Sequence, residues 1–222
     1  MTAVPTTPGV PTVPTSGVPA MPTLGGHASG VPSRGLYAHA GRRPSMLAVG
    51  TTVWLASELM FFGGLFASYF TIRAAAPVWP GPDAALATGR DAAFTMLLVA
   101  SSGTMQWAVH LLANGDRRRA LRWVVITIVL GSVFLANQGV EWATLTLRPS
   151  TSAYGSLFFI MTGFHGLHVA LGLAAMVGLL LRLGAGGSAD TGAEPAAEVI
   201  TYYWHFVDVV WIGLFVTLFL MR

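Results

Sequence analysis

The sequence predicts an all-α integral membrane bundle of five transmembrane helices. The chain is 54% hydrophobic and only 9% charged, which excludes an ordinary soluble domain. Five apolar stretches each exceed the roughly 20 residues that a helix needs to cross a hydrocarbon layer of about 30 Å. None of them alternates in and out as a barrel strand does. Bounded by the charges that interrupt them, the predicted helices cover 46–72, 92–113, 123–147, 153–181 and 199–221.

The residues before the first apolar stretch have a different character. Val-Pro-Thr recurs at 4–6, 10–12 and 13–15, and residues 1–45 contain eight of the thirteen prolines. The first basic residue is Arg34, so the early positive charge of a secretory signal is missing. We therefore expect a disordered Pro/Thr/Gly-rich extension over 1–45, followed by a transmembrane domain over 46–222.

The arginines between the spans predict how the bundle is oriented. Eight of the twelve fall on the side of the N-terminus, the densest group being the turn at 114–119. The positive-inside rule then places the N-terminus in the cytoplasm of a bacterium, with the chain in the plasma membrane. No basic stripe is interleaved with aromatic residues, so nucleic acid is not an expected partner. The absence of cysteine excludes disulfides and thiolate metal sites.

Ionisable side chains inside the predicted spans are the main functional signal. A charge at the centre of a bilayer costs at least a few kcal/mol, so each such residue is expected to face protein and marks a candidate site. At about 1.5 Å of rise per residue, two of them, Glu58 and His168, lie at similar depths and are predicted to meet. The set consists of Glu58, His110, Glu141, His165, His168, His205 and Asp208.

The fourth span offers a polar face with several glycines. His165 and His168 are three residues apart, so they share one face of a helix with Thr162 and Gly172. The glycines at 163, 166 and 172 are expected to let another helix approach closely. The Gly63–Gly64 pair of the first span is also interpreted as a close-packing element.

Five motifs resemble the cytochrome c oxidase subunit III family of the haem–copper oxidases. They follow the same order and spacing over nearly all of residues 46–222. They are Ser-Glu-Leu-Met-Phe-Phe at 57–62, Gly-Thr-Met-Gln-Trp-Ala-Val-His at 103–110, Gln-Gly-Val-Glu-Trp at 138–142, Phe-Phe-Ile-Met-Thr-Gly-Phe-His-Gly-Leu-His-Val-Ala-Leu-Gly at 158–172 and Tyr-Tyr-Trp-His-Phe-Val-Asp-Val-Val-Trp at 202–211. The count of five spans resembles the short bacterial form, which lacks two leading helices.

The resemblance implies a non-catalytic subunit of an aa3-type cytochrome c oxidase. It implies that Glu58, with His168, His165, Phe61 and Phe62 nearby, lies beside a cleft that holds phospholipid. The cleft is expected between the first two helices and the other three. Haem a and copper would belong to the partner subunits I and II. This chain would stabilise subunit I and support its proton uptake, alone or within a larger respiratory supercomplex.

The sequence alone leaves the remaining polar residues and several rival functions open. His110, Glu141, His205 and Asp208 are interpreted as structural polar residues that hydrogen-bond within the bundle. A haem or metal site on the histidines is the competing interpretation, but no histidine has zinc-like ligand spacing. The same spans are compatible with the matching subunit of a quinol oxidase or a nitric oxide reductase, with a proton-coupled transporter and with a haem-bearing anchor.

Overall fold

The computed structural model describes residues 46–80, 88–150, 152–185 and 193–221, and within these ranges it contains helices and no strand. All five helices are long and apolar enough to cross a membrane, so the predicted all-α, five-span class is confirmed. The predicted extension over 1–45 lies outside the described residues. The helices are α1 (Met46–Ala75), α2 (Thr88–Ala113), α3 (Arg117–Thr144), α4 (Ala153–Ala185), α5 (Ala193–Phe215) and the short π-helical turn η1 (Val216–Leu220).

Several helices begin earlier than the charges in the sequence indicate. A charged side chain outside the hydrocarbon layer does not stop a helix, so α3 starts at Arg117 and α5 at Ala193. Asp116 fixes the start of α3, because its carboxylate accepts a hydrogen bond from the backbone N–H of Arg119 at 3.1 Å. The exclusion of Asp91 from the second span was wrong, since this residue lies in α2 and is buried.

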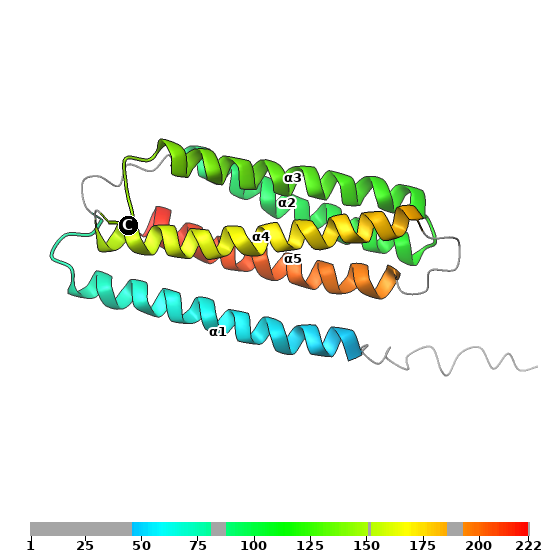
Figure 1. Ribbon diagram of the computed structural model, residues 1–222, viewed down its shortest axis with the longest axis horizontal. Coiled ribbons are helices and arrows are strands. Elements are labelled where there is room, and N and C mark those ends of the chain that lie inside the picture. The colour runs from blue at the N-terminus through cyan, green and yellow to red at the C-terminus, as the bar shows by residue number, and fades with distance from the viewer. Residues whose placement is uncertain (1–45, 81–87, 151, 186–192, 222) are drawn as a thin grey trace, which may run out of the picture. The chain divides into compact units, whose positions relative to one another are not determined.

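Helices α2 to α5 form one packed body, and α1 lies against one side of it. Within the body, α2 packs against α3 and α5, and α4 packs against the same two helices. Among the described helices, α1 contacts only α4 and α5 substantially, and Figure 1 shows it running beside them at the edge of the bundle. The prediction that α1 and α2 stand together, apart from the other three helices, was therefore wrong.

Trp204 fills the centre of the four-helix body. Its ring is fully buried and lies against Gly131 of α3 and Gly172 of α4. A methyl group at either glycine would come within 2.8 Å of the ring, so only glycine fits there. Gly166, also expected at a tight contact, has room for a methyl group 3.7 Å from Leu135.

The Gly63–Gly64 pair does not pack closely within this chain. A methyl group added at either glycine would have no neighbour within 4 Å, and both residues are exposed on α1. The prediction of close packing for this pair was therefore wrong within the described part of the chain. Its surface lies on the side of α1 that the four-helix body leaves uncovered.

Two tyrosines hold the C-terminal turn η1 in place. Carbonyl groups in the last turn of a helix lack partners along the chain and must find donors elsewhere. Tyr69 of α1 donates to the carbonyl of Thr217 at 3.1 Å, and Tyr154 of α4 donates to that of Leu218 at 2.8 Å. The hydroxyl of Tyr69 also accepts a hydrogen bond from the indole N–H of Trp79 at 3.0 Å.

Candidate functional site

Glu58 of α1 and His168 of α4 form a carboxyl–imidazole pair between the two helices. The Oε2 atom of Glu58 lies 3.2 Å from Nε2 of His168, so the predicted contact is confirmed. The other ring nitrogen, Nδ1, lies 2.7 Å from the carbonyl oxygen of Phe164. A carbonyl only accepts, so Nδ1 carries a proton, and a hydrogen bond at Nε2 requires one further proton there or on Glu58. The pair thus holds one proton that either group can carry.

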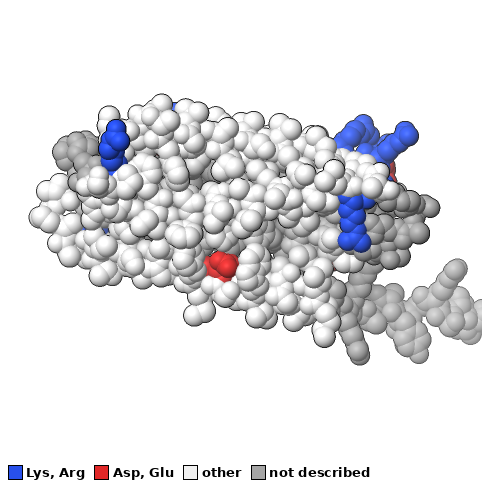
Figure 2. All heavy atoms as spheres, in the orientation of Figure 1, with Lys and Arg blue, Asp and Glu red and all other residues white. Residues whose placement is uncertain are grey.

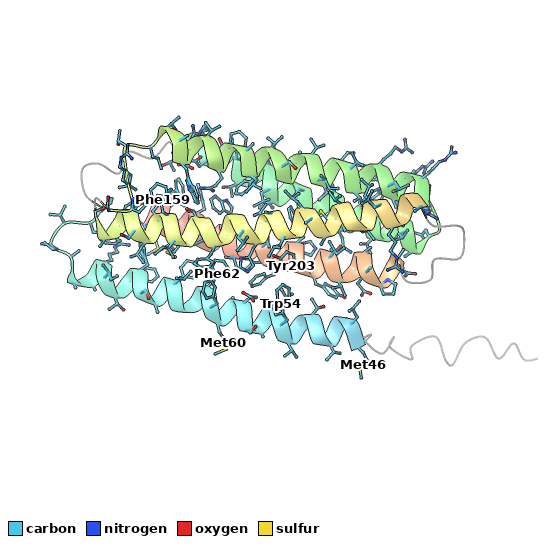
Figure 3. All side chains as sticks on the ribbon, viewed as in Figure 1. Met46, Trp54, Met60, Phe62, Phe159 and Tyr203 are labelled. Carbon is cyan, nitrogen blue, oxygen red and sulfur yellow. The ribbon has the colours of Figure 1, made fainter. Side chains whose placement is uncertain are left out.

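Aromatic rings surround the pair on the side of the bundle. Phe62 meets the ring of His168 edge-on at 5.2 Å between centroids. Tyr203 of α5 donates its hydroxyl to the backbone carbonyl of His168 at 2.8 Å, and Trp54 stacks on Tyr203 at 5.5 Å. Figure 3 shows Trp54 and Phe62 pointing from α1 toward the other helices, whereas Met60 points away. These contacts fix the imidazole, and they leave the carboxyl on the open side.

The carboxyl group of Glu58 is the exposed end of this pair. Its side chain is 23% exposed, whereas that of His168 is 9% exposed. Figure 2 shows one acidic patch midway along an otherwise uncharged face, between α1 and α4, with arginines at the ends. Phe61, predicted beside the cleft, is 39% exposed on the same helix. In the membrane, the Glu58 carboxyl therefore faces the lipid or protein that covers this side of the bundle.

His165 does not join the pair, although it lies one turn away on α4. It is completely buried, and neither of its ring nitrogens has a hydrogen-bond partner among the described residues. Trp211 packs on its ring at 4.8 Å and Phe134 at 6.1 Å between centroids. Within the described ranges, no three His, Asp or Glu side chains group closely enough to hold a metal ion.

A second polar group lies between α2 and α5. The hydroxyl of Ser102 hydrogen-bonds the carboxyl of Asp208, which is 5% exposed. The Nδ1 atom of His205 lies 3.0 Å from the same hydroxyl oxygen, and its Nε2 lies 3.4 Å from Oε1 of Gln106. The sequence reasoning singled out Asp208 and His205 but missed Ser102, which connects them. Its spacing from Thr95 and Leu98 on the buried face of α2 is the signal that could have found it.

A third polar group joins α2 to α3. Asp91 accepts a hydrogen bond from the amide of Asn137 at 3.3 Å, and Arg90 lies 3.6 Å from the same carboxyl oxygen. Glu141 lies buried on α3, and its Oε1 atom, like Oδ2 of Asp91, has no hydrogen-bond partner among the described residues. The helix-joining role of Glu141 therefore stays a prediction.

His110 lies apart from these groups. It is exposed in the last turn of α2, where Nε2 lies 3.1 Å from the amide nitrogen of Asn114. The prediction that it hydrogen-bonds inside a packed bundle was wrong, because within the described part of the chain its side chain hydrogen-bonds only this neighbour, one turn further along. Trp107, which lies beside it, is exposed as well.

Two grooves in the described part of the chain lie along α1. An apolar groove of about 300 Å³ opens between the first half of α1 and helices α4 and α5. A second space of about 390 Å³ lies between α1 and Tyr202 of α5. The first groove is lined by Thr51, Trp54, Leu171, Ala175, Val199, Ile200 and Tyr203. This groove lies between α1 and the α4–α5 pair, and Glu58 is not among its lining residues.

Comparison with known proteins agrees with this architecture. The family model described as cytochrome c oxidase subunit III matches residues 34–221. A protein of Nocardia farcinica named probable cytochrome c oxidase subunit 3 is 48% identical over 83% of this chain and 92% of its own length. Relatives from Mycobacterium leprae and Corynebacterium diphtheriae are 46% and 45% identical, over 90% and 81% of this chain and 98% and 90% of their own lengths. The chain belongs to the cytochrome c oxidase subunit III family, and it is a multi-pass protein of the bacterial membrane.

Proposed function

We propose that this chain is a non-redox accessory subunit of an aa3-type cytochrome c oxidase. In this role it stabilises the catalytic haem–copper subunit I while oxygen is reduced, and it supports proton uptake by that subunit. The relatives named cytochrome c oxidase subunit 3 favour cytochrome c over quinol as the electron donor. Haem a and copper are held by subunits I and II, and this chain contributes protein surface and bound lipid.

The observation that carries the proposal is the position of the Glu58–His168 pair. It combines a proton that two groups can share with a carboxyl that is open on the membrane face. A carboxyl left against acyl chains would be costly, so a lipid headgroup, water or a partner helix must cover it. Next to it, Gly63 and Gly64 leave open space on α1, which suits close approach of a partner helix. We place the contact with subunit I here.

The apolar groove beside α1 is the proposed phospholipid site. It lies about one turn from Glu58, and the stacked rings of Trp54 and Tyr203 form part of its wall. An acyl chain filling it would pack α1 against α4 and α5, where protein contacts are otherwise sparse. The N-terminus faces the cytoplasm in this arrangement, because the arginine-rich turn at 117–119 lies on the same side as the start of α1.

Isolation of the chain from its host membrane tests the proposed function. We expect the tagged full chain, purified in mild detergent, to bring haem–copper subunits with it, and the haem a spectrum to follow those subunits. Phospholipid should remain bound after delipidating washes that remove bulk lipid. Purification of the chain without oxidase subunits, or a haem band that stays with this chain after the others are removed, would overturn the proposal.

A further inference from the structure

Polar side chains form a stripe along one face of α2. Ser102, Gln106, His110 and Asn114 are each four residues apart, so they lie nearly above one another on the helix. The stripe begins at the arginine-rich turn after α2 and ends near the middle of the bundle. A polar row of this length on a membrane helix is costly unless it serves contacts or transport.

Contacts with α5 connect the deep end of this stripe to a buried acid. His205 lies between Gln106 and Ser102, with its two ring nitrogens at 3.4 and 3.0 Å from their oxygens. Ser102 in turn hydrogen-bonds Asp208. Exposure falls along this series, because Gln106 is exposed, His205 is half-buried and Asp208 is buried. The other oxygen of Asp208, Oδ1, has no partner among the described residues, so the series ends there.

The hydrogen-bonding capacity of these groups allows two arrangements that differ by one proton shift. In the first, Asp208 is protonated and donates to Ser102, Ser102 donates to Nδ1 of His205, and Nε2–H of His205 donates to Gln106. In the second, Nδ1–H of His205 donates to Ser102, whose own hydrogen points to an ionised Asp208. Moving from the first arrangement to the second breaks the O–H bonds of Asp208 and Ser102. It forms a new O–H bond on Ser102 and an N–H bond at Nδ1 of His205. No electron is transferred, and every hydrogen bond is kept.

We propose that Ser102 relays a proton between the half-buried imidazole of His205 and the buried carboxyl of Asp208. The amide oxygen of Gln106 accepts the hydrogen bond from Nε2–H of His205 and orients the ring, because an amide does not itself take up or release the proton. The transported species is the proton, and Asp208 is the group that receives it. This relay is separate from the Glu58–His168 pair, which lies between α1 and α4.

Helices α1, α2 and α4, which pack against α5, carry further ionisable groups. None of them hydrogen-bonds Asp208, whose partner among the described side chains is Ser102. Besides the tyrosines, these groups are Glu58 and Arg73 on α1, Arg90, Asp91 and His110 on α2, and His165, His168 and Arg182 on α4. The proton on Asp208 is therefore controlled through Ser102 and His205.

Infrared spectroscopy of the purified oxidase complex tests the relay. We expect a carboxylic C=O band that disappears in Asp208→Asn, changes with pH and shifts after transfer to D2O. Ser102→Ala should slow that exchange by about 10²-fold, because it removes the positioned group that passes the proton. Ser102→Thr, which keeps the hydroxyl, should restore it.

Ser101→Ala is the matched control. Ser101 is also buried, but its hydroxyl accepts a hydrogen bond from the indole of Trp204 at 2.9 Å and is not part of the relay. If Ser102→Ala does not assemble, His205→Gln at the half-buried position gives the same test. Equal exchange in the relay and control variants, or an Asp208 band that never responds to pH, would overturn the relay. The readout is the carboxyl itself, so it is independent of any accessory role in turnover.

Discussion

The four-helix body and α1 are held by different means. Inside the body, buried indole N–H groups find hydroxyl partners on neighbouring helices, as Trp204 does with Ser101 and Trp211 with Thr95, both at 2.9 Å. In an apolar 18-residue stretch of α1, only 11% of the residues are buried inside the chain, compared with 61% in the corresponding stretch of α5 and η1. Lipid gives no hydrophobic drive for helices to associate, so close packing and hydrogen bonds decide what stays together. The body is therefore fixed, and α1 is held at a few points.

The same difference separates the two groups that each contain a carboxyl and a histidine. Asp208 lies in the body, bridged by a serine and closed off from lipid. Glu58 lies at the edge of α1, in direct contact with His168 and partly exposed. The first suits proton transfer within the chain, and the second suits contact with lipid or a partner. Substitutions in the four-helix body should therefore lower the free energy of unfolding more than substitutions in α1.

The largest effect is expected from Gly172→Ala in the body. The added methyl group would lie 2.8 Å from the buried ring of Trp204, which Gly131 confines from the other side. Overpacking of this kind costs about 2 to 3 kcal/mol of unfolding free energy. Thermal unfolding of the purified complex in detergent, together with the yield of assembled oxidase, measures the loss.

Gly166→Ala on the same helix is the control for that variant. Its methyl group would meet Leu135 at 3.7 Å, an ordinary contact. Both variants gain the same helix propensity, about 1 kcal/mol for alanine over glycine. The difference between them therefore isolates the clash with Trp204. Equal stability of the two variants would show that the body is not packed as tightly as described.

A smaller and more local effect is expected from Tyr69→Phe, which breaks the tie between α1 and η1. The variant leaves the indole of Trp79 without an acceptor and the carbonyl of Thr217 without a donor. We expect a loss of about 1 to 2 kcal/mol of unfolding free energy, because one buried and one partly buried group lose their partner. Hydrogen exchange should rise in α1 and η1 and stay unchanged in α3.

Tyr202→Phe serves as the comparison for Tyr69→Phe. The hydroxyl of Tyr202 donates to Glu198 one turn earlier on the exposed face of α5, and its loss should leave exchange in α1 as it is. If exchange in α3 rises along with that in α1 after Tyr69→Phe, then α1 is part of the cooperative body. The distinction between the two regions would then be lost.

The sequence predicted the number of spans and the meeting of Glu58 with His168, but not the pairing of helices. Hydropathy and helical rise fix the length and depth of a span without reference to its neighbours. Whether α2 lies with α1 or with α3 depends on side chains such as Ser102 and Asn137, whose partners are distant in sequence. The depth of a residue in the membrane can be predicted from its own helix, whereas a contact depends on the side chains of two helices.

Errors at single residues have the same origin. A charge usually marks the end of a span, which places Asp91 at the boundary of the second one, but the hydrogen bond from Asn137 on α3 gives this carboxyl a partner inside the bundle. Glycine spacing on α4 correctly indicated a face for packing, yet it could not show that Trp204 lies against Gly172 and not Gly166. The spacing of glycines indicates which face of a helix packs against a neighbour. The opposing side chain decides which glycine on that face has no room for a methyl group.

The smallest effect on stability is expected at Glu58. Interhelical hydrogen bonds in membranes contribute about 0.6 kcal/mol on average, so Glu58→Ala should hardly change unfolding. We expect the initial rate of oxygen consumption to stay largely intact and the enzyme to lose activity sooner during turnover. Recording oxygen uptake until activity stops separates these two quantities. An immediate and complete loss of electron transfer would contradict the accessory role.

Glu58→Gln separates the contact from the proton. Because Nδ1 of His168 keeps its proton against the carbonyl of Phe164, Nε2 can accept a hydrogen bond from the amide of a glutamine. The substituted side chain would preserve the tie between α1 and α4 but could not hold a shared proton. If the edge of α1 serves mainly to organise lipid and partner contacts, Glu58→Gln should keep the wild-type lifetime in turnover. A lifetime as short as that of Glu58→Ala would instead mean that the proton, and not the contact, is what protects the enzyme.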